Sequence, residues 1–183
     1  LRFTNKVNLY IFHLVVLKMG MPQIILNPFD KKETQLDEVK ALEVELILQD
    51  MALHDILHEN TFYFDQAYNM HTTKYFNLQE NKNIPNNTSS IILGSGTTGE
   101  RKKIYFSSEQ LAIGHKNSIE AFHGSAKESF FCFTTVYYPH ARFNFNLALL
   151  KGMTLYIPEE RPGNIIKFCN DNKIEHIKLN ANQ

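Results

Sequence analysis

The chain has 183 residues, of which 43% are hydrophobic, and its 19 basic residues balance 19 acidic ones. This composition is typical of a globular chain with one sizeable core, and it excludes an extended disordered protein. Because the net charge is zero, no overall field attracts nucleic acid or an anionic membrane, and we expect neither as a partner.

The cysteine content and the longest apolar run bear on the cellular compartment. Cys132 and Cys169 are too few for a disulfide framework and lie in apolar stretches, which favours a reducing, cytoplasmic location. The apolar run 9–17 contains His13 and is too short to span a bilayer, so we expect no membrane span. The chain begins at Leu1 without the pattern of a secretory signal, which favours a piece of a longer protein.

Helices and strands alternate over the first 68 residues. A helical period predicts a helix over 7–19 with Gly20 as its cap, and the run 23–26 predicts a strand ended by the turn Asn27-Pro28. A more polar helix over 35–43, a strand over 44–48, a helix over 51–58 and a strand over 61–64 follow. This order predicts an α/β fold with layered, largely parallel sheets and flanking helices.

Residues 69–90 are rich in Asn, Thr, Lys and Ser and show no clear periodicity, so we expect a loop. Just before it, His54 and His58 lie four residues apart, the spacing of two zinc ligands on one helix face. Asp55 stands where the zinc pattern has Glu, and no third ligand is signalled nearby. Two surface histidines are therefore the preferred interpretation, and we expect no metal held by the protein alone.

A glycine-rich stretch follows a predicted strand over 89–93 and precedes another over 103–106. Glycines allow close backbone approach to an anion, hydroxyls add donors, and a lysine adds a mobile positive charge. These features predict a polyphosphate site, and its residues are Ser95, Gly96, Thr97, Thr98, Gly99 and Lys102.

Three known phosphate-loop patterns fit this stretch poorly. A dinucleotide fingerprint requires a helix at its last glycine, but a strand is predicted there. In the Walker A pattern, Glu100 would occupy the position of the lysine. In the protein-kinase loop, Arg101 would replace Val, and no H-R-D or D-F-G sequence follows.

The remaining elements continue the α/β order. Ser107 and Gln110 form a capping-box pattern, which predicts a helix from there to about residue 122. A strand over 130–136, a helix over 143–150 ended by Gly152, and a strand over 153–157 follow. The last predicted elements are a helix over 162–172, with Pro162 in its first turn, and a strand over 174–179.

The glycine-rich stretch resembles the S-G-T-T-G-x-P-K loop of the adenylate-forming superfamily, which includes acyl-CoA synthetases, luciferases and peptide-synthetase adenylation domains. Arg101 replaces the usual Pro, Lys103 the usual Gly, and Gly94 the usual Ser or Thr before the motif. The resemblance extends over nearly the whole chain. It includes residues 15–20, the Leu26-Asn27-Pro28 turn, and residues 149–155.

The resemblance also implies a carboxylate pocket near the sequence Tyr137-Tyr138-Pro139-His140. Tyr138 fits the family's aromatic or histidine position in one alignment and His140 in another. Ala141 stands where many members have Gly, so the pocket is expected to differ. Alternatively, Tyr137 and Tyr138 are core residues at the end of a strand.

In function, the resemblance implies ATP-dependent adenylation of a carboxylic acid, with Mg²⁺ accompanying ATP and coenzyme A as a possible acceptor. It implies a partial AMP-binding N-terminal domain over 1–183, divided into a first α/β part (1–68), a loop (69–90) and a second part (91–183). The family's Tyr-Gly-x-Thr-Glu motif and its C-terminal domain with a catalytic Lys are absent from these residues. We therefore expect an incomplete site without catalytic residues of its own. The alternative is a non-catalytic nucleotide-binding or protein-interaction module derived from such an enzyme.

Overall fold

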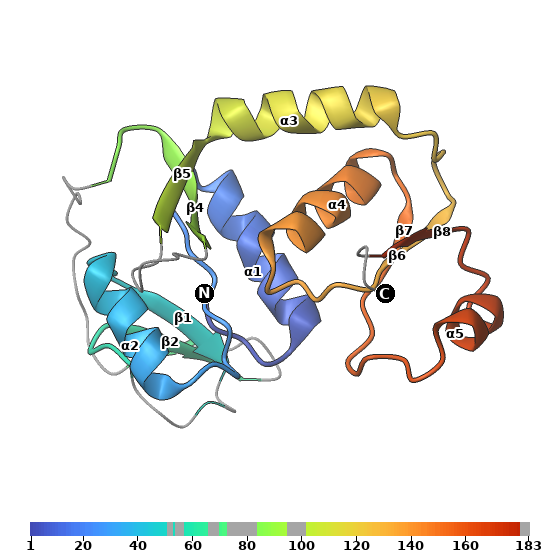
Figure 1. Cartoon of the computed structure of the whole chain (residues 1–183). Helices are drawn as coiled ribbons and strands as arrows, with labels where there is room; N and C mark the ends of the chain where they lie inside the picture. Colours follow the sequence, from blue (N-terminus) through green and yellow to red (C-terminus); the bar gives the residue numbers. More distant parts are fainter. Residues whose placement is uncertain (51–52, 54–56, 66–69, 73–83, 95–101, 180–183) are drawn as a thin grey trace. The chain divides into compact units, whose positions relative to one another are not determined.

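The computed structural model describes residues 1–50, 53, 57–65, 70–72, 84–94 and 102–179. The chain forms two compact units, Leu1–Phe106 and Ser107–Gln183. Each unit combines one or two small sheets with flanking helices (Figure 1). The predicted α/β class is therefore confirmed. None of the described helices is both long enough and apolar enough to cross a membrane.

The first unit contains a three-stranded and a two-stranded sheet. Strands β1 (Ile47–Asp50), β2 (Thr61–Phe64) and β3 (Met70–Thr72) lie in that order. Strands β1 and β2 are parallel, whereas β2 and β3 are antiparallel. The second sheet pairs β4 (Thr88–Gly94) with β5 (Lys102–Ser107).

Two short extended segments connect these sheets. Residues 1–2 pair with β1 and residues 23–26 pair with β4, each through an isolated parallel bridge. The two segments are joined to each other by backbone hydrogen bonds of 2.7 and 2.9 Å. The segment 23–26 was predicted as a strand, but it pairs with β4 at a single residue only. The main chain is nevertheless bonded continuously from β4 to β1.

Two helices flank the sheets of the first unit. Helix α1 (Lys6–Lys18) begins at the N-cap Asn5, whose side chain accepts a hydrogen bond from the Asn8 amide. It ends before Gly20, which has a φ of +70°, as predicted from glycine's tolerance of the left-handed region. Helix α2 (Lys32–Ala41) begins three residues before the predicted start at residue 35 and ends before Leu42.

Helix α2 is held against the sheets by apolar and polar contacts. Its Val39 packs in a buried cluster with residues of β1 and β4, and the cluster comprises Ile24, Leu26, Val39, Leu42, Ile47, Leu57 and Ile91. The buried Arg2 donates from Nε to Gln35 Oε1 in α2 at 2.6 Å and from Nη1 to Gln49 Oε1 in β1 at 3.1 Å. A buried guanidinium bonded on both sides fixes the helix to the strand.

The second unit contains one parallel sheet in the order β7-β6-β8. Its strands are β6 (Ser129–Cys132), β7 (Thr154–Tyr156) and β8 (His176–Lys178). Its helices are α3 (Ser108–Ala121), α4 (Pro139–Leu150) and α5 (Ile165–Asp171). Phe131 of β6 contacts Phe168 of α5 at 5.1 Å between ring centroids, and His115 of α3 stacks on Phe143 of α4 at 4.4 Å.

The predicted capping box of α3 is confirmed. The Gln110 amide donates to Ser107 Oγ at 3.1 Å, and the Ser107 amide donates to Gln110 Oε1 at 2.9 Å. Two amides without partners in the helix are thus satisfied reciprocally.

Several predicted boundaries in the second unit are corrected. The helix predicted from Pro162 begins at Ile165, because the Asn164 side chain caps it by accepting from the Lys167 amide at 2.9 Å. Helix α4 begins at Pro139 and not at residue 143, since the fixed φ of proline suits the first helical position. Strand β6 ends at Cys132, and a turn closed by the Tyr138 amide and the Thr135 carbonyl at 3.0 Å replaces the rest of the predicted strand.

The segment 69–90 is not wholly a loop. Met70–Thr72 forms β3, and β4 begins at Thr88. Strand β3 exists because its backbone pairs antiparallel with β2, and its polar composition does not signal this pairing. The helix predicted over 51–58 lies largely outside the described residues, which include only 53, 57 and 58 of that range.

Candidate functional site

Strands β4 and β5 bring the two ends of the glycine-rich stretch together (Figure 1). A Cβ placed on Gly94, the last residue of β4, would lie 3.8 Å from Lys102 Cβ and 3.7 Å from Ile104 Cδ1. These distances are ordinary van der Waals contacts. Residues 95–101 therefore connect the end of β4 to the start of the neighbouring strand β5.

Most of the predicted phosphate-binding residues lie within that connection. Ser95, Gly96, Thr97, Thr98 and Gly99 lie outside the described residues, so their contacts stay a prediction. Lys102 is described, and it is the exposed first residue of β5. Its side chain shares a face of the strand with Ile104, beside Gly94.

Lys103 has a different environment from Lys102. Neighbouring residues of a strand point to opposite faces, and Lys103 shares its face with Tyr105, which packs on the buried cluster of the first unit. The Lys103 ammonium donates a hydrogen bond to the carbonyl oxygen of Ala41, the last residue of α2. The last carbonyls of a helix lack partners within it and carry partial negative charge, so a cation is favoured there.

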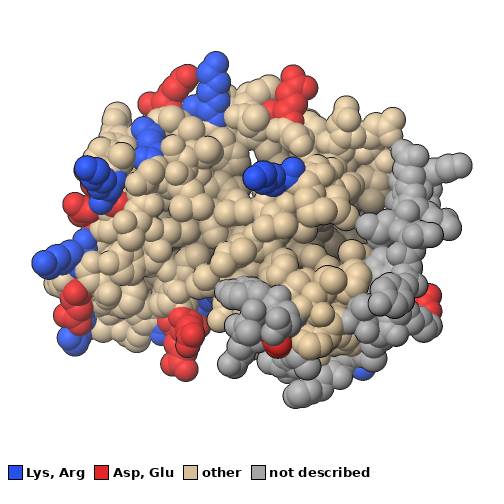
Figure 2. Space-filling view, turned by 180° about the vertical axis from the view of Figure 1, so that it is seen from behind, with Lys and Arg blue, Asp and Glu red and all other residues tan. Residues whose placement is uncertain are grey.

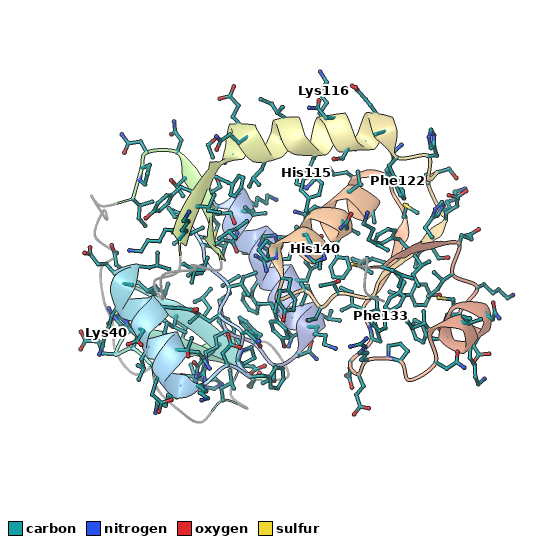
Figure 3. The ribbon with its side chains drawn as sticks, viewed as in Figure 1. Lys40, His115, Lys116, Phe122, Phe133 and His140 are labelled. Carbon is teal, nitrogen blue, oxygen red and sulfur yellow. The ribbon has the colours of Figure 1, made fainter. Side chains whose placement is uncertain are left out.

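Tyr138 and His140, the predicted carboxylate-pocket residues, belong to the second unit. Tyr138 is the N-cap of α4 with 52% of its surface exposed, and His140 is exposed in the first turn (Figure 3). Tyr137 is buried at 8% exposure. The alternative of two core tyrosines therefore holds for Tyr137 and fails for Tyr138.

Arg142 is a structural residue of this region that the sequence analysis missed. Its side chain is 6% exposed, and Nη1 donates to the carbonyl oxygens of Val136 at 2.9 Å and Tyr137 at 2.8 Å. Burial lowers the pKa of Arg142 to about 10. The guanidinium fixes the turn that leads to Tyr138. The available signal was that Arg142 is the only Lys, Arg, Asp or Glu residue in the helix.

The structure describes only one histidine of the predicted zinc-like pair. His54 lies outside the described residues, and His58 Nδ1 accepts a hydrogen bond from the Asn60 amide at 3.1 Å. Among the described residues, no group of three or more His, Cys, Asp or Glu side chains is placed to hold a metal ion.

A carboxylate and a histidine are paired at the edge of the second unit's sheet. His176 Nε2 lies 2.6 Å from Glu128 Oε2, which also accepts from the Ser125 amide at 2.8 Å. Hydrogen bonds from Ser125, together with the His176 side chain, lower the pKa of Glu128 to about 2. The pair fastens β8 to the turn before β6.

A cavity of about 440 Å³ lies in the first unit, and its lining does not include Lys102, the described residue of the predicted phosphate site. It is lined by the end of α1, by residues 42–48 and by residues 84–88.

On the face shown in Figure 2, the coloured charges of both signs are interspersed and form no patch of one sign.

Comparison with known families decides what kind of protein this is. The family model described as "AMP-binding enzyme" matches residues 3–179. The chain belongs to the AMP-binding enzyme family. The resemblance predicted from the glycine-rich stretch to the adenylate-forming superfamily is thereby confirmed.

Solved structures of adenylate-forming enzymes share the fold of this family member. O-succinylbenzoate coenzyme A synthetase (MenE) from Bacillus subtilis, in complex with ATP and magnesium ion, matches with a TM-score of 0.72 and 10% identity over 96% of this chain and 48% of that one. ATP-bound MatB from Rhodopseudomonas palustris matches with a TM-score of 0.70 and 13% identity over 92% of this chain and 37% of that one.

A third match is the nonribosomal peptide synthetase FmoA3, with a TM-score of 0.71 and 12% identity over 94% of this chain and 19% of that one. The chain thus spans about half the length, or less, of these structures. A search of curated protein sequences found no significant match.

Proposed function

We propose that the chain binds the β- and γ-phosphates of ATP as part of an enzyme that adenylates a carboxylic acid. The phosphate-binding residues in this proposal are Ser95, Gly96, Thr97, Thr98, Gly99 and Lys102. The observation that carries it is the pairing of β4 and β5, which places Gly94 beside Lys102 at the two ends of the glycine-rich connection. Backbone amides and hydroxyls from such a connection suit an anion next to the Lys102 ammonium.

The ligands of the structural matches support a nucleotide as that anion. The MenE structures include complexes with ATP and magnesium ion, with AMP, and with the acyl-adenylate intermediate. ATP with Mg²⁺ is therefore the proposed ligand here. Coenzyme A is a proposed acceptor, because the matched MenE is named as a coenzyme A synthetase.

The proposed chemistry gives Lys102 a defined role. A carboxylate oxygen attacks the α-phosphorus of ATP in line, and the bond to the bridging oxygen of pyrophosphate breaks. Negative charge then builds on the leaving group, where a cation and aligned hydroxyl donors stabilise it. Lys102 supplies the cation, and Ser95, Thr97 and Thr98 supply the donors. Mg²⁺ accompanying ATP would neutralise further phosphate charge.

The carboxylic acid is proposed to bind near Tyr138 and His140. Both side chains are exposed at the N-terminus of α4, which carries partial positive charge. Arg142 supports this position by holding the preceding turn through two carbonyl oxygens. The alignment register leaves either Tyr138 or His140 as the residue that contacts the acid.

Other parts of the proposal concern the protein as a whole. Several exposed apolar side chains, including Ile166 at 75% and Leu150 at 61%, are proposed to pack against the remainder of such a domain or against a protein partner. Cys132 and Cys169 are free thiols, which suits a cytoplasmic location. The division into 1–68, 69–90 and 91–183 likewise stays a proposal about the family's domain.

A second candidate is a nucleotide-binding module without catalysis. It is favoured by Arg101 and Lys103, which replace the Pro and Gly of the family's loop. Such a module would bind ATP, but neither this chain nor a longer form of the protein would catalyse the reaction of ATP with a carboxylate.

Calorimetric titration of the purified chain with ATP, tripolyphosphate and AMP tests phosphate binding. We expect ATP and tripolyphosphate to bind and AMP to bind at least about tenfold more weakly than ATP, because charge-assisted bonds to the outer phosphates are lost. Equal affinity for ATP and AMP, or no binding of tripolyphosphate, would contradict the assignment.

A further inference from the structure

Lys103 occupies a position where the family's loop motif has Gly, and the structure gives its side chain a specific partner. The ammonium reaches across 62 positions of sequence to the carbonyl oxygen of Ala41. Ala41 ends α2, and the carbonyls of the three residues before it accept hydrogen bonds from backbone amides that follow the helix. The amides of Leu42, Glu43 and Val44 bond to the carbonyls of residues 38, 40 and 39 respectively. The Ala41 carbonyl is therefore available to an outside donor.

Helix α2 is a rigid anchor for such a contact. Val39 and Leu42 are buried in the apolar cluster, with exposures of 4% and 6%. Gln35 of the same helix is bonded through Arg2 to β1. A side chain attached to the end of α2 is thus attached to the core of the first unit.

We propose that Lys103 is a positioning residue for Lys102. By binding the C-terminal end of α2, Lys103 fixes the start of β5, from which Lys102 extends on the opposite face of the strand. The inference rests on the proposed binding of ATP phosphates by Lys102. It assigns to this chain a second lysine that acts through the backbone and touches no phosphate.

The alternating geometry of a strand explains why the two lysines divide these tasks. Lys102 and Ile104 share the face beside Gly94, whereas Lys103 and Tyr105 share the face toward the apolar cluster. A single lysine side chain extends from only one face of the strand, so one position cannot supply both contacts. The motif's glycine would leave the start of β5 without this attachment to α2.

The test compares ATP and AMP affinities of the full 183-residue chain in four variants. Lys103→Met keeps the apolar stem and removes the donor, Lys103→Arg restores a donor, and Lys102→Met removes the proposed phosphate ligand. Lys40→Met is the matched control, because Lys40 is an exposed cation in the last turn of the same helix (Figure 3).

We expect Lys103→Met to weaken ATP binding about threefold and to leave AMP binding unchanged, as the size of a cation's interaction with a helix terminus suggests. Lys103→Arg should recover most of the loss, and Lys40→Met should show none. Lys102→Met should show a larger loss for ATP. Urea unfolding should change by no more than about 1 kcal/mol in any of the four variants, the size of a cation's interaction with a helix terminus, so that each variant stays folded during the titrations.

Four results would overturn the inference. Equal ATP losses in Lys103→Met and Lys40→Met would show a general charge effect. Parallel losses of ATP and AMP affinity would show a general disturbance of the fold. Wild-type affinity in Lys103→Met, with a loss in Lys102→Met, would reject the positioning role and retain the proposed function. No loss in Lys102→Met would reject both.

Discussion

Two glycines that look alike in the sequence have different reasons to be glycine. Gly94 ends β4 with ordinary backbone geometry, and an added Cβ would meet its neighbours at 3.7 and 3.8 Å. Gly152 follows α4 with a φ of +73°, where an L side chain is strained. Only at Gly152 does the backbone conformation require a glycine.

A pair of alanine substitutions tests this difference. Gly94→Ala should raise the free energy of unfolding by about 0.5 kcal/mol, since alanine loses less chain entropy in a strand. Gly152→Ala should lower it by about 1 kcal/mol, since a side chain is forced into the left-handed region. Urea unfolding of both variants measures the change. A loss of stability in Gly94→Ala as large as that in Gly152→Ala would contradict the geometry of β4.

The roles of single residues could be predicted from sequence only where a local pattern carries them. The phosphate-binding roles of the hydroxyls and Lys102 rest on a contiguous loop motif and stay predictions. Arg142 was missed, because its partners are backbone carbonyls of a turn that was predicted as a strand. The partner of Lys103 lies 62 residues away and leaves no local signal.

At the scale of elements, prediction succeeded where a helix end is determined locally. The Ser107 and Gln110 capping box, Gly20 and Gly152 all mark the ends that the structure shows. Strand β3 was missed, because it depends on pairing with β2 and not on its own composition. The start of α5 was misplaced, because the Asn164 cap is stronger than the signal of Pro162 two residues before it.

The bond between Glu128 and His176 predicts a pH dependence for the second unit. The pKa of Glu128 is lowered in the folded state to about 2 from an ordinary value of 4.5. The folded state therefore binds this proton less readily than the unfolded state does. Its stabilising contribution is complete above about pH 4.5 and is lost as the pH falls toward 2.

Urea unfolding of Glu128→Gln and wild type across this range checks the prediction. The variant should be less stable at pH 6, and the difference should shrink steadily below pH 4.5. Glu120→Gln, an exposed change on α3, is the control. A difference that stays constant from pH 6 to pH 2.5 would show that the carboxylate charge of Glu128 contributes nothing.

At the scale of the whole molecule, we expect phosphate binding and catalysis to be separable. The 183 residues contain no Tyr-Gly-x-Thr-Glu motif, the source of the magnesium-associated Glu in the resemblance above. A glycine-rich loop stabilises the leaving pyrophosphate but not the α-phosphorus, and several kcal/mol of barrier reduction at that atom correspond to many powers of ten in rate. We therefore predict that this chain by itself does not adenylate.

Exchange of labelled pyrophosphate into ATP measures this directly, with the purified chain and a panel of fatty, aromatic and amino acids. No carboxylate-dependent exchange is expected with any acid. Clear exchange with one of them would show that these residues hold a complete active site.

The central claim is that Lys102 binds the outer phosphates of ATP, and a single substitution tests it most directly. Calorimetric titration should show that Lys102→Ala weakens ATP binding by about tenfold or more and leaves AMP binding unchanged, because AMP has no β- or γ-phosphate for the lysine to reach. Lys116→Ala, an exposed lysine on α3 (Figure 3), should bind both nucleotides as the wild type does. Equal losses for ATP and AMP in Lys102→Ala would contradict the claim.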